Sequence, residues 1–503
     1  MQRKGQRCIA RSRAQNRISH TAADQLIDDY PGLQSRRILP IGRLIGARSS
    51  HTPQAIASPP IHWSRPLVTQ APEPQSQLAA IAYGSKIIAM GNREFDIVVF
   101  GATGFVGALT ARYLADNAPA GTKIALAGRS EARLAATRAT LPAIAHDWPL
   151  IIADADSPAS LDALAARTQV ICTTVGPYLR YGESLVAAAA SAGTDYVDLT
   201  GEIPFVRRSI DKHHDTAIDS GARIVHACGF DSVPSDIGAY VLHRQVADDG
   251  AGELTDTTMI LTNFRGGVSG GTIDSMRVIA DLAADKNERK LLLDPDALTD
   301  GPNESGPRAA QPSDIASVRA SSVDPSLRGR LAPFFMASYN TRIVRRSNAL
   351  LGGAYGKDFR YSETMKVGSN PITSALAAVG VQLGMGAFFG AMAVKPLRPL
   401  FDRVLPKPGE GPSEKSRDKG FFVTETYTRT TTGRRYRSRM KASGDPGYKA
   451  TAVMLGQSAL ALALERDRLP AVVGVLTPAA AMGDVLVDRL RAAGFEITAV
   501  ELH

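Results

Sequence analysis

The segment FDIVVFGATGFVGALTARYLADNA, residues 95–118, decides the fold class of this chain. It opens with an apolar run, Phe95–Phe100, in which Asp96 is the one polar residue, and such a run is typical of a parallel strand covered on both faces. A glycine-rich turn follows, and apolar residues then recur at helical spacing. Strand, glycine turn and helix in this order are the context that a dinucleotide-binding motif requires.

The glycine turn has the spacing GxxGxxG, a variant that is common among NADP-binding domains. The first glycine permits a tight turn, the second lets the backbone approach a pyrophosphate, and the third lets the helix pack closely on the strand. The helix N-terminus offers unpaired N–H groups to the phosphates. A purely structural turn is the alternative. The residues expected to bind the cofactor here are Gly101, Ala102, Thr103, Gly104, Phe105, Val106 and Gly107.

The end of the second expected strand, Lys123–Ala127, favours NADP(H) over NAD(H) as the cofactor. An Asp or Glu at this place would bind the 2′-hydroxyl of NAD. This chain has Arg129, whose guanidinium suits bidentate contact with a 2′-phosphate, and Ser130 adds a hydroxyl. The alternative is a solvated arginine at the start of the next helix.

Further strand–helix units continue to Asp236, so we expect an α/β fold with a Rossmann-type parallel sheet over residues 94–236. Asp154, after the strand at 150–153, is a candidate adenine contact, and an N-cap of the helix that follows is the equal alternative. The strand at 169–175 ends in Gly176 and Pro177. Because ligands bind at the carboxyl ends of such strands, both are expected to line the nicotinamide side.

The catalytic residues are unknown from the sequence. Tyr178 is a weak candidate for the proton donor because it follows Gly176 and Pro177 at a strand end and carries a proton at neutral pH. A wall-lining role is the stronger expectation for it. Asp231, Ser232 and Asp236 read more readily as turn and cap residues than as catalysts.

Beyond Asp236 the strand–helix alternation loosens, which indicates a second, mixed α+β domain over residues 237–480. Alternating polarity around Gly433 predicts two antiparallel strands there. Residues 481–503 read as a helix and a strand that pack back on the first domain. Residues 1–93 are rich in Arg, Ser and Pro, and read as a disordered or spurious extension ahead of a start at Met90, with a transit peptide as the alternative.

The charge distribution excludes nucleic acid as an expected partner. The net charge is +9, but residues 1–89 hold 12 Lys/Arg against 4 Asp/Glu, so the remaining 414 residues are almost neutral. A nucleic-acid binder shows its basic patch on the folded domain. The three cysteines are too few and too scattered for a disulfide framework or a zinc site, which favours a reducing compartment such as the cytoplasm and predicts no metal.

Residues 367–394 contain no charged side chain, and this run of 28 residues is long enough to cross a bilayer. Its many Ala and Gly residues make it only moderately hydrophobic. Three alternatives stay open: a surface segment that takes up a lipid chain or touches a membrane peripherally, a buried core helix, and a true membrane span.

Several motifs together resemble the saccharopine dehydrogenase-like oxidoreductases, over about residues 94–503. They are FGATGFVG, AGRS, VGPY, YVDLTGE, GFDSVPSD, GGVSGGT at 266–272, GPSE at 411–414 with Lys419–Phe421, VLTP at 475–478 and AAGFEI. Their order is most similar to that of the trans-acting enoyl reductases of phthiocerol-type polyketide lipid assembly. The resemblance implies an NADP(H)-dependent reductase of an enoyl chain, with a lipid or polyketide substrate on an acyl carrier domain as its partner.

Two other classes of protein remain open at this point. One is a saccharopine dehydrogenase-like reductase of an imine or a ketone. The other is a non-catalytic lipid-surface protein that keeps the Rossmann scaffold, since fold does not fix function. The side chains with which saccharopine dehydrogenases bind their charged substrate have no match here, so saccharopine itself is not the expected substrate.

Overall fold

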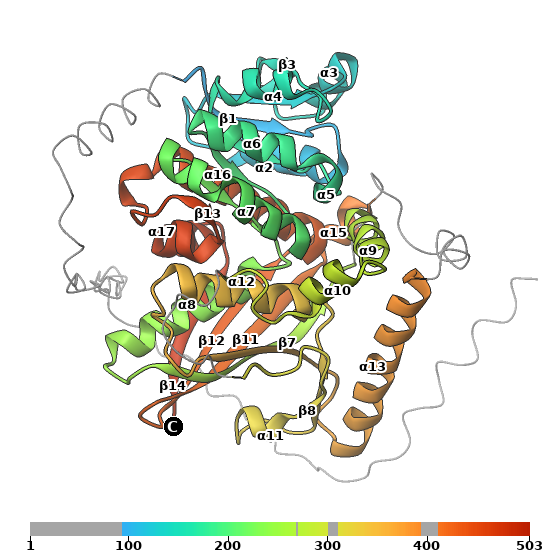
Figure 1. The fold of residues 1–503 in the computed structure, drawn as a ribbon, viewed down its shortest axis with the longest axis vertical. Helices are drawn as coiled ribbons and strands as arrows, with labels where there is room; N and C mark the ends of the chain where they lie inside the picture. Colours follow the sequence, from blue (N-terminus) through green and yellow to red (C-terminus); the bar gives the residue numbers. More distant parts are fainter. Residues whose placement is uncertain (1–92, 268–269, 300–309, 394–410) are drawn as a thin grey trace, which may run out of the picture. The chain divides into compact units, whose positions relative to one another are not determined.

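The computed structural model describes residues 93–267, 270–299, 310–393 and 411–503. Two seven-stranded sheets organise these residues (Figure 1). The first sheet is built mainly from the N-terminal half of the described chain, and the second mainly from the C-terminal half. This arrangement confirms the expected α/β class, with a Rossmann-type parallel sheet and a second mixed α+β part.

The first sheet is parallel throughout, in the order β13-β6-β5-β4-β1-β2-β3. Val98 at its centre pairs with Ala125 on one side and Ile171 on the other. Every apolar residue of β1 is buried, so both faces of the sheet are covered, as its sequence predicts. The strands are β1 (Phe95–Phe100), β2 (Ile124–Gly128), β3 (Leu150–Ile152), β4 (Thr168–Thr173), β5 (Asp195–Val197), β6 (Arg223–Val225) and β13 (Gly474–Leu476).

Helices from both ends of the chain pack on this sheet. The helix that follows the glycine turn, α2, packs beside α16 against β1 and β4, while α4, α6 and α7 pack on one another. The helices are α2 (Phe105–Asn117), α3 (Glu131–Ala139), α4 (Pro158–Ala165), α5 (Tyr178–Tyr181), α6 (Glu183–Ala192), α7 (Ile203–Ser220), α16 (Thr451–Leu464) and α17 (Pro478–Ala492). The late helix α16 therefore belongs with the first sheet, although the sequence suggested the second domain for it.

The second sheet is mixed, in the order β14-β12-β11-β7-β10-β9-β8, and β7 with β10 is its parallel pair. The two strands expected around Gly433 are confirmed as the antiparallel hairpin β11–β12, with Gly433 at a positive φ of 84° in the turn. The strands are β7 (Leu254–Arg265), β8 (Val318–Arg319), β9 (Arg330–Pro333), β10 (Arg360–Lys366), β11 (Phe421–Thr430), β12 (Arg435–Ser443) and β14 (Glu496–Leu502).

The helices of the second part join its sheet to the first. The long helix α8 packs on β11, β12 and β14, and also contacts α12 and α17. Two further helices, α9 and α10, follow β7 and approach the ends of the first sheet. The helices are α8 (Val233–Asp248), α9 (Gly270–Leu282), α10 (Lys286–Leu293), α11 (Ala320–Val323), α12 (Ala337–Leu350), α13 (Pro371–Ala393) and α15 (Glu414–Asp418).

The C-terminal strand lies elsewhere than expected. β14 pairs antiparallel with β12, with Ala499 opposite Ser438, so it closes the second sheet rather than packing on the first. The late strand that joins the first sheet is β13. Its three residues are all buried, so their polarity does not alternate in a way that would indicate the strand it pairs with. A pattern of alternation predicts a strand, but it does not say which open sheet edge the strand will pair with. The domain limits at 236 and 480 remain predictions.

The expected extension over residues 1–93 falls almost wholly outside the described residues. Arg93 is described, and it belongs to the fold. Its guanidinium donates hydrogen bonds of 2.7 Å to the carbonyl oxygens of Ala165 and Ala192. The first domain therefore includes at least this one residue ahead of the predicted boundary.

Helix α13 carries most of the apolar run at 367–394, and it lies on the surface (Figure 1). It rests on β9 through two fully buried small residues, Ser374 and Ala378. Its large apolar side chains are exposed instead: Ile372 (74%), Leu376 (71%), Val379 (49%), Leu383 (69%) and Phe389 (43%). The core-helix alternative is thus wrong. Among the described residues, α13 is the one helix long and apolar enough to cross a membrane.

Candidate active site

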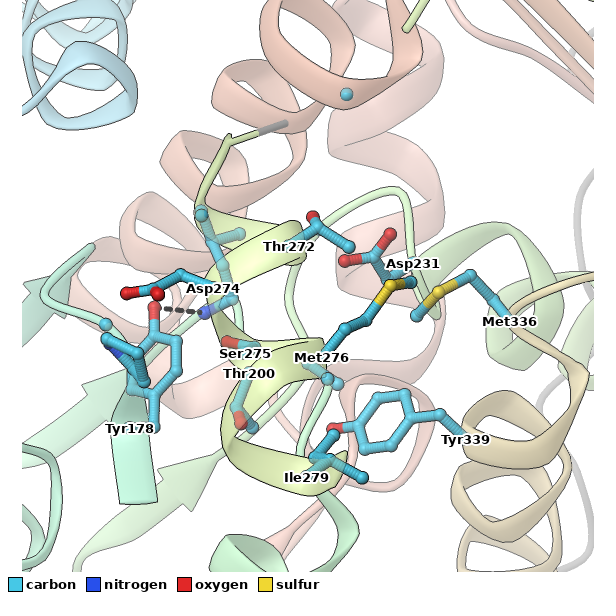
Figure 2. Close-up of a pocket in the computed structure, with 18 of the residues that line it drawn as sticks. Tyr178, Thr200, Asp231, Thr272, Asp274, Ser275, Met276, Ile279, Met336 and Tyr339 are labelled. Carbon is cyan, nitrogen blue, oxygen red and sulfur yellow. Dashed lines mark hydrogen bonds between the residues drawn. The ribbon is translucent and has the colours of Figure 1, made fainter. Parts of the chain in front are cut away.

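A cavity of about 550 Å³ lies where the carboxyl ends of the first sheet's strands meet helices of the second part (Figure 2). This is the edge at which open α/β sheets bind their ligands, and the volume is typical of a ligand site. One end of the cavity is formed by the glycine turn and the loop after β4. The other end is formed by α9, α10 and the start of α12, with Phe389 of α13 beside them.

Some residues of the glycine turn shape its backbone, and others line the cavity. Gly101 has a φ of 86°, which favours glycine, and a Cβ on Gly107 would lie 2.2 Å from the Gly101 carbonyl oxygen. Gly104 differs, because its backbone is extended and a Cβ there would meet that oxygen at 3.3 Å. The predicted cofactor residues that line the cavity are Gly104, Phe105, Val106, Gly176 and Pro177, while Gly101, Ala102, Thr103 and Gly107 support the turn from outside it.

The end of β2 carries two arginines rather than one. Arg129 is exposed directly after the strand, and Ser130 caps α3 by accepting a 3.4 Å hydrogen bond from the Arg133 N–H. The Arg133 guanidinium reaches to 3.5 Å from the Thr103 carbonyl oxygen, beside the glycine turn. Neither arginine forms an ion pair within the described part of the chain. Sequence reasoning missed Arg133, although its place one helical turn after Arg129 was a usable signal.

Asp154 has a local structural role. Its carboxylate accepts a 3.2 Å hydrogen bond from the Asp156 N–H, and its own N–H donates to the Ser160 hydroxyl at 3.1 Å. The residue does not line the cavity. The N-cap alternative is wrong, because Ser157 occupies the N-cap position of α4, and the adenine contact stays a prediction.

The second part closes on the glycine turn through Phe105. The Tyr448 ring packs edge-on against Phe105 at 5.1 Å, and the Arg417 guanidinium lies 5.2 Å from the centre of the Phe105 ring. Gly411 fits here because a Cβ on it would lie 2.3 Å from the same ring. Gly411 therefore lets this segment approach the cofactor turn closely.

Glu202 connects the two ends of the cavity. Its carboxylate accepts hydrogen bonds from the N–H groups of Tyr178 (3.0 Å) and Leu179 (2.8 Å), in the loop that follows Pro177. It also accepts one of 2.6 Å from the Ser275 hydroxyl on α9. Burial raises the pKa of Glu202, and these three donors oppose that rise. The position of α9 is thereby tied to the loop expected to hold the nicotinamide.

Asp198 connects several backbone and side-chain groups beneath the cavity. It accepts hydrogen bonds from the Tyr196 hydroxyl (3.0 Å), His226 Nδ1 (2.7 Å) and the N–H groups of Thr200 and Ala227 (3.0 Å each). All of this network is buried. It fixes the ends of β5 and β6, which explains why the YVDLTGE motif carries an acidic residue just after its strand.

Tyr178 is placed as a wall residue. Its hydroxyl accepts a 3.1 Å hydrogen bond from the Leu199 N–H (Figure 2). It donates to the Thr173 carbonyl oxygen at 3.4 Å. Burial raises the pKa of this phenol well above its usual value. Because both hydrogen-bonding functions are engaged with the backbone, the hydroxyl is not available to a substrate.

Asp231, Ser232 and Asp236, all in the GFDSVPSD motif, have different roles in the structure. Asp236 accepts hydrogen bonds from the Ser347 hydroxyl and the Ala479 N–H, and Ser232 donates to Asn340 at 3.0 Å, so both are structural. Asp231 instead lines the cavity and has no hydrogen-bond partner among the described residues. Burial raises the pKa of its carboxyl to about 6. Asp231 thus lies in the turn before α8, as expected, and its side chain also faces the cavity.

The cavity wall beyond these polar groups is apolar and uncharged. Residues from α9, α10, α12 and α13 form it: Met276, Ile279, Ala280, Ala283, Leu292, Leu293, Phe335, Met336 and Phe389. No Lys, Arg or His lines the cavity in the part of the chain that the structure describes, and its two carboxylates are Asp231 and Asp274. The described residues also contain no cluster of His, Cys, Asp and Glu that could hold a metal ion.

A glycine turn at a helix N-terminus, arginines at the end of β2 and a cavity at the strand ends define a Rossmann-type NADP-dependent oxidoreductase. Residues 97–225 match the family model described as the saccharopine dehydrogenase NADP binding domain. A solved apo saccharopine dehydrogenase (L-Glu forming) from Saccharomyces cerevisiae covers 81% of this chain, and is itself covered to 99%, at 14% identity and a TM-score of 0.46.

The relatives define the family more narrowly. A "Putative trans-acting enoyl reductase" of Mycobacterium tuberculosis (strain ATCC 25618 / H37Rv) is 55% identical over 414 residues, which are 82% of this chain and 98% of the relative. A trans-acting enoyl reductase of Mycobacterium ulcerans (strain Agy99) is 49% identical over 422 residues, 83% of this chain and 100% of the relative. The chain belongs to the trans-acting enoyl reductase family.

Proposed function

We propose that this protein reduces the carbon–carbon double bond of an enoyl chain that is held as a thioester on a carrier domain. The observation that carries the proposal is the cavity itself. Its one end is the cofactor turn, and its other end is an apolar wall that reaches Phe389 on the exposed helix α13. Such a wall suits a long acyl chain, because burial of each CH₂ contributes about 0.8 kcal/mol.

The charge of the cavity favours a thioester over a free acid. A substrate with a free carboxylate needs a cationic partner when it is buried. The described lining offers no cation that could pair with such a carboxylate. A carrier thioester masks that carboxyl group. The same reasoning disfavours saccharopine and similar amino-acid conjugates as substrates.

The residues present fit the cofactor that the fold implies. Bound NADPH supplies the hydride, and the protein orients the reacting carbon and excludes water. Gly104 leaves its backbone open at the N-terminus of α2 for the pyrophosphate, and Arg129 and Arg133, which follow β2, would hold the 2′-phosphate. Gly176 and Pro177 line the part of the cavity beside the apolar wall.

The proposal is tested by following NADPH consumption with enoyl chains of increasing length, each supplied tethered to a carrier protein and as the free acid. We expect kcat/KM to be higher for the tethered form and to rise with chain length by up to about 4-fold per CH₂ before levelling off. Reduction of tethered ketones or of imines, with no reduction of any tethered alkene, would assign the protein to the alternative class of reductase.

One substitution shows whether the apolar wall receives the chain. Ala280→Trp places a large ring on α9 in the cavity, and we expect it to lower kcat/KM for long chains at least about 10-fold while sparing short ones. Ala284→Trp is the matched control, because Ala284 lies one turn further on, is exposed and lies outside the cavity. Equal losses in the two variants, or no loss in either, would place the chain elsewhere.

We also propose that the protein works in the cytoplasm with α13 lying on a membrane surface. Four exposed apolar residues, Ile372, Leu376, Val379 and Leu383, recur at helical spacing and so form one face of the helix. A contiguous exposed apolar face of this kind is typical of an interaction site. Phe389 links the same helix to the cavity, so a lipid-like product would leave beside the bilayer.

Vesicle binding tests the membrane contact. The protein is expected to co-sediment with phospholipid vesicles and to be released by mild detergent. Leu376→Asp with Leu383→Asp should abolish sedimentation and leave the melting temperature nearly unchanged, because both side chains are about 70% exposed. Undiminished sedimentation of this double variant, or unfolding of it, would contradict the proposal.

A further inference from the structure

Tyr339 brings a phenol hydroxyl to the wall of the cavity. Tyr339 lies in the first turn of α12, is only 3% exposed and lines the cavity. Its hydroxyl has no hydrogen-bond partner among the described residues. A buried hydroxyl left unpaired costs about 1–3 kcal/mol, and in the wall of a cavity a bound ligand can supply the missing partner.

The surroundings of Tyr339 place this hydroxyl on the substrate side of the cavity. Figure 2 shows the phenol directed toward α9, where Met276 and Ile279 form the apolar wall. Met276 is unbranched and has three rotatable bonds, so it can move aside for a ligand. Burial and nearby carboxylates, Asp198 first among them, raise the pKa of the phenol well above its usual value. Tyr339 therefore keeps its proton and acts as a hydrogen-bond donor.

Asp231 is the second cavity group without a partner. It follows β6, whereas Tyr339 comes from α12, so two separate elements bring an acid and a hydroxyl to the same wall. The two are close enough for the Asp231 charge to contribute to the raised pKa of Tyr339. Burial raises the pKa of Asp231 to about 6, which is near the range in which a carboxylic acid can both hold and deliver a proton.

We propose that Tyr339 donates a hydrogen bond to the carbonyl oxygen of the bound thioester and that Asp231 protonates the carbon next to that carbonyl. This inference rests on the proposed enoyl reduction. Hydride from NADPH forms a C–H bond at the β-carbon, and the electron pair of the double bond moves onto the carbonyl oxygen, giving an enolate. The Tyr339 hydroxyl stabilises this enolate. The α-carbon then takes the proton of Asp231, and the carboxylate regains a proton from solvent.

Two conservative substitutions separate the roles. Tyr339→Phe removes a hydroxyl that has no partner, so we expect the fold to keep or gain stability, while kcat falls about 100-fold or more and the Kd of NADPH stays unchanged. Asp231→Asn keeps the shape but cannot deliver a proton, and kcat should fall at least about 10-fold with KM within about 3-fold.

Tyr355→Phe is the matched control for the first substitution. Tyr355 is also fully buried with an unpaired hydroxyl, but it lies outside the cavity, against Phe359 and His243. We expect its kcat to equal that of the unmodified protein. If Tyr339→Phe behaves in the same way, the hydroxyl has no part in the reaction.

A spectroscopic measurement without NADPH distinguishes the donor from a packing effect. A dienoyl chain tethered to a carrier protein is the probe, because a hydrogen bond to its carbonyl polarises the conjugated system and shifts its absorption to longer wavelength. We expect the shift in the unmodified protein and in Asp231→Asn, and its loss in Tyr339→Phe. An unchanged shift in Tyr339→Phe overturns the assignment of the donor, and full kcat in Asp231→Asn overturns that of the acid.

The outcome also separates this inference from the proposed function. If the unmodified protein reduces no tethered alkene, the enoyl assignment fails as a whole. If it does reduce tethered alkenes while both variants match Tyr355→Phe, the reductase assignment stands and only the assignment of Tyr339 and Asp231 fails.

Discussion

Gly104→Val is expected to weaken NADPH binding by at least about 100-fold while the protein remains folded. The Gly104 backbone faces the cavity at the N-terminus of α2, with an extended φ of −79° that any residue adopts. A Cβ there meets the Gly101 carbonyl oxygen at 3.3 Å, which a small shift relieves. The two methyl groups of valine would occupy the space that the pyrophosphate needs, which would remove several hydrogen bonds to charged oxygens at about 1.5–3 kcal/mol each.

Gly107→Ala is the control with the opposite expected result, a loss of stability rather than of NADPH affinity. Its Cβ would lie 2.2 Å from the Gly101 carbonyl oxygen, a backbone atom of a tight turn, so helix and turn must separate. We expect a loss of about 1–3 kcal/mol in the free energy of unfolding. Fluorescence titration with NADPH and thermal denaturation measure both effects. Full NADPH affinity in Gly104→Val would mean that the pyrophosphate lies elsewhere.

Arg129→Asp is expected to weaken NADPH by about 100-fold and NADH by less than about 3-fold. The substitution removes a charge-assisted bidentate contact and places a like charge beside the 2′-phosphate, which NADH lacks. Arg133, which reaches the glycine turn, is expected to retain part of the affinity. Dissociation constants for both cofactors supply the comparison.

Lys123→Asp is the matched control for this substitution. Lys123 is exposed immediately before β2, and Arg129 is exposed immediately after it, so the same change of charge is made at opposite ends of one strand. We expect the ratio of the two dissociation constants to be unchanged in Lys123→Asp. The same ratio in Arg129→Asp would show that another group reads the phosphate.

The first sheet was predictable because its signals are local. The apolar run of β1, the three glycines and the helix after them lie within 24 residues, and backbone sterics alone assign a task to each glycine. The hairpin around Gly433 was predictable for the same reason. The apolar run of α13 was also visible in the sequence. Its exposure to solvent was not predictable, because exposure depends on which surfaces the rest of the chain covers.

The polar groups of the cavity wall could not be predicted in the same way. Tyr339 is separated from the glycine turn by more than 230 residues, and its distinguishing property is a missing partner, which only packing reveals. Tyr178 shows the converse, since a well-placed phenol proved to be engaged with the backbone. Asp231 lies in a turn, as its motif predicts, but the sequence did not show that its side chain also faces the cavity.

The bridge made by Glu202 has a consequence for the order of events. One carboxylate holds both the loop after Pro177 and helix α9, so a ligand that orders the loop also orders the surface that faces the second ligand. Thermodynamic linkage makes this effect reciprocal: whatever NADPH adds to the affinity for the acyl chain, the chain adds to the affinity for NADPH. If the chain binds as proposed, the protein holds an unreduced acyl chain less tightly when NADPH is absent than when it is bound.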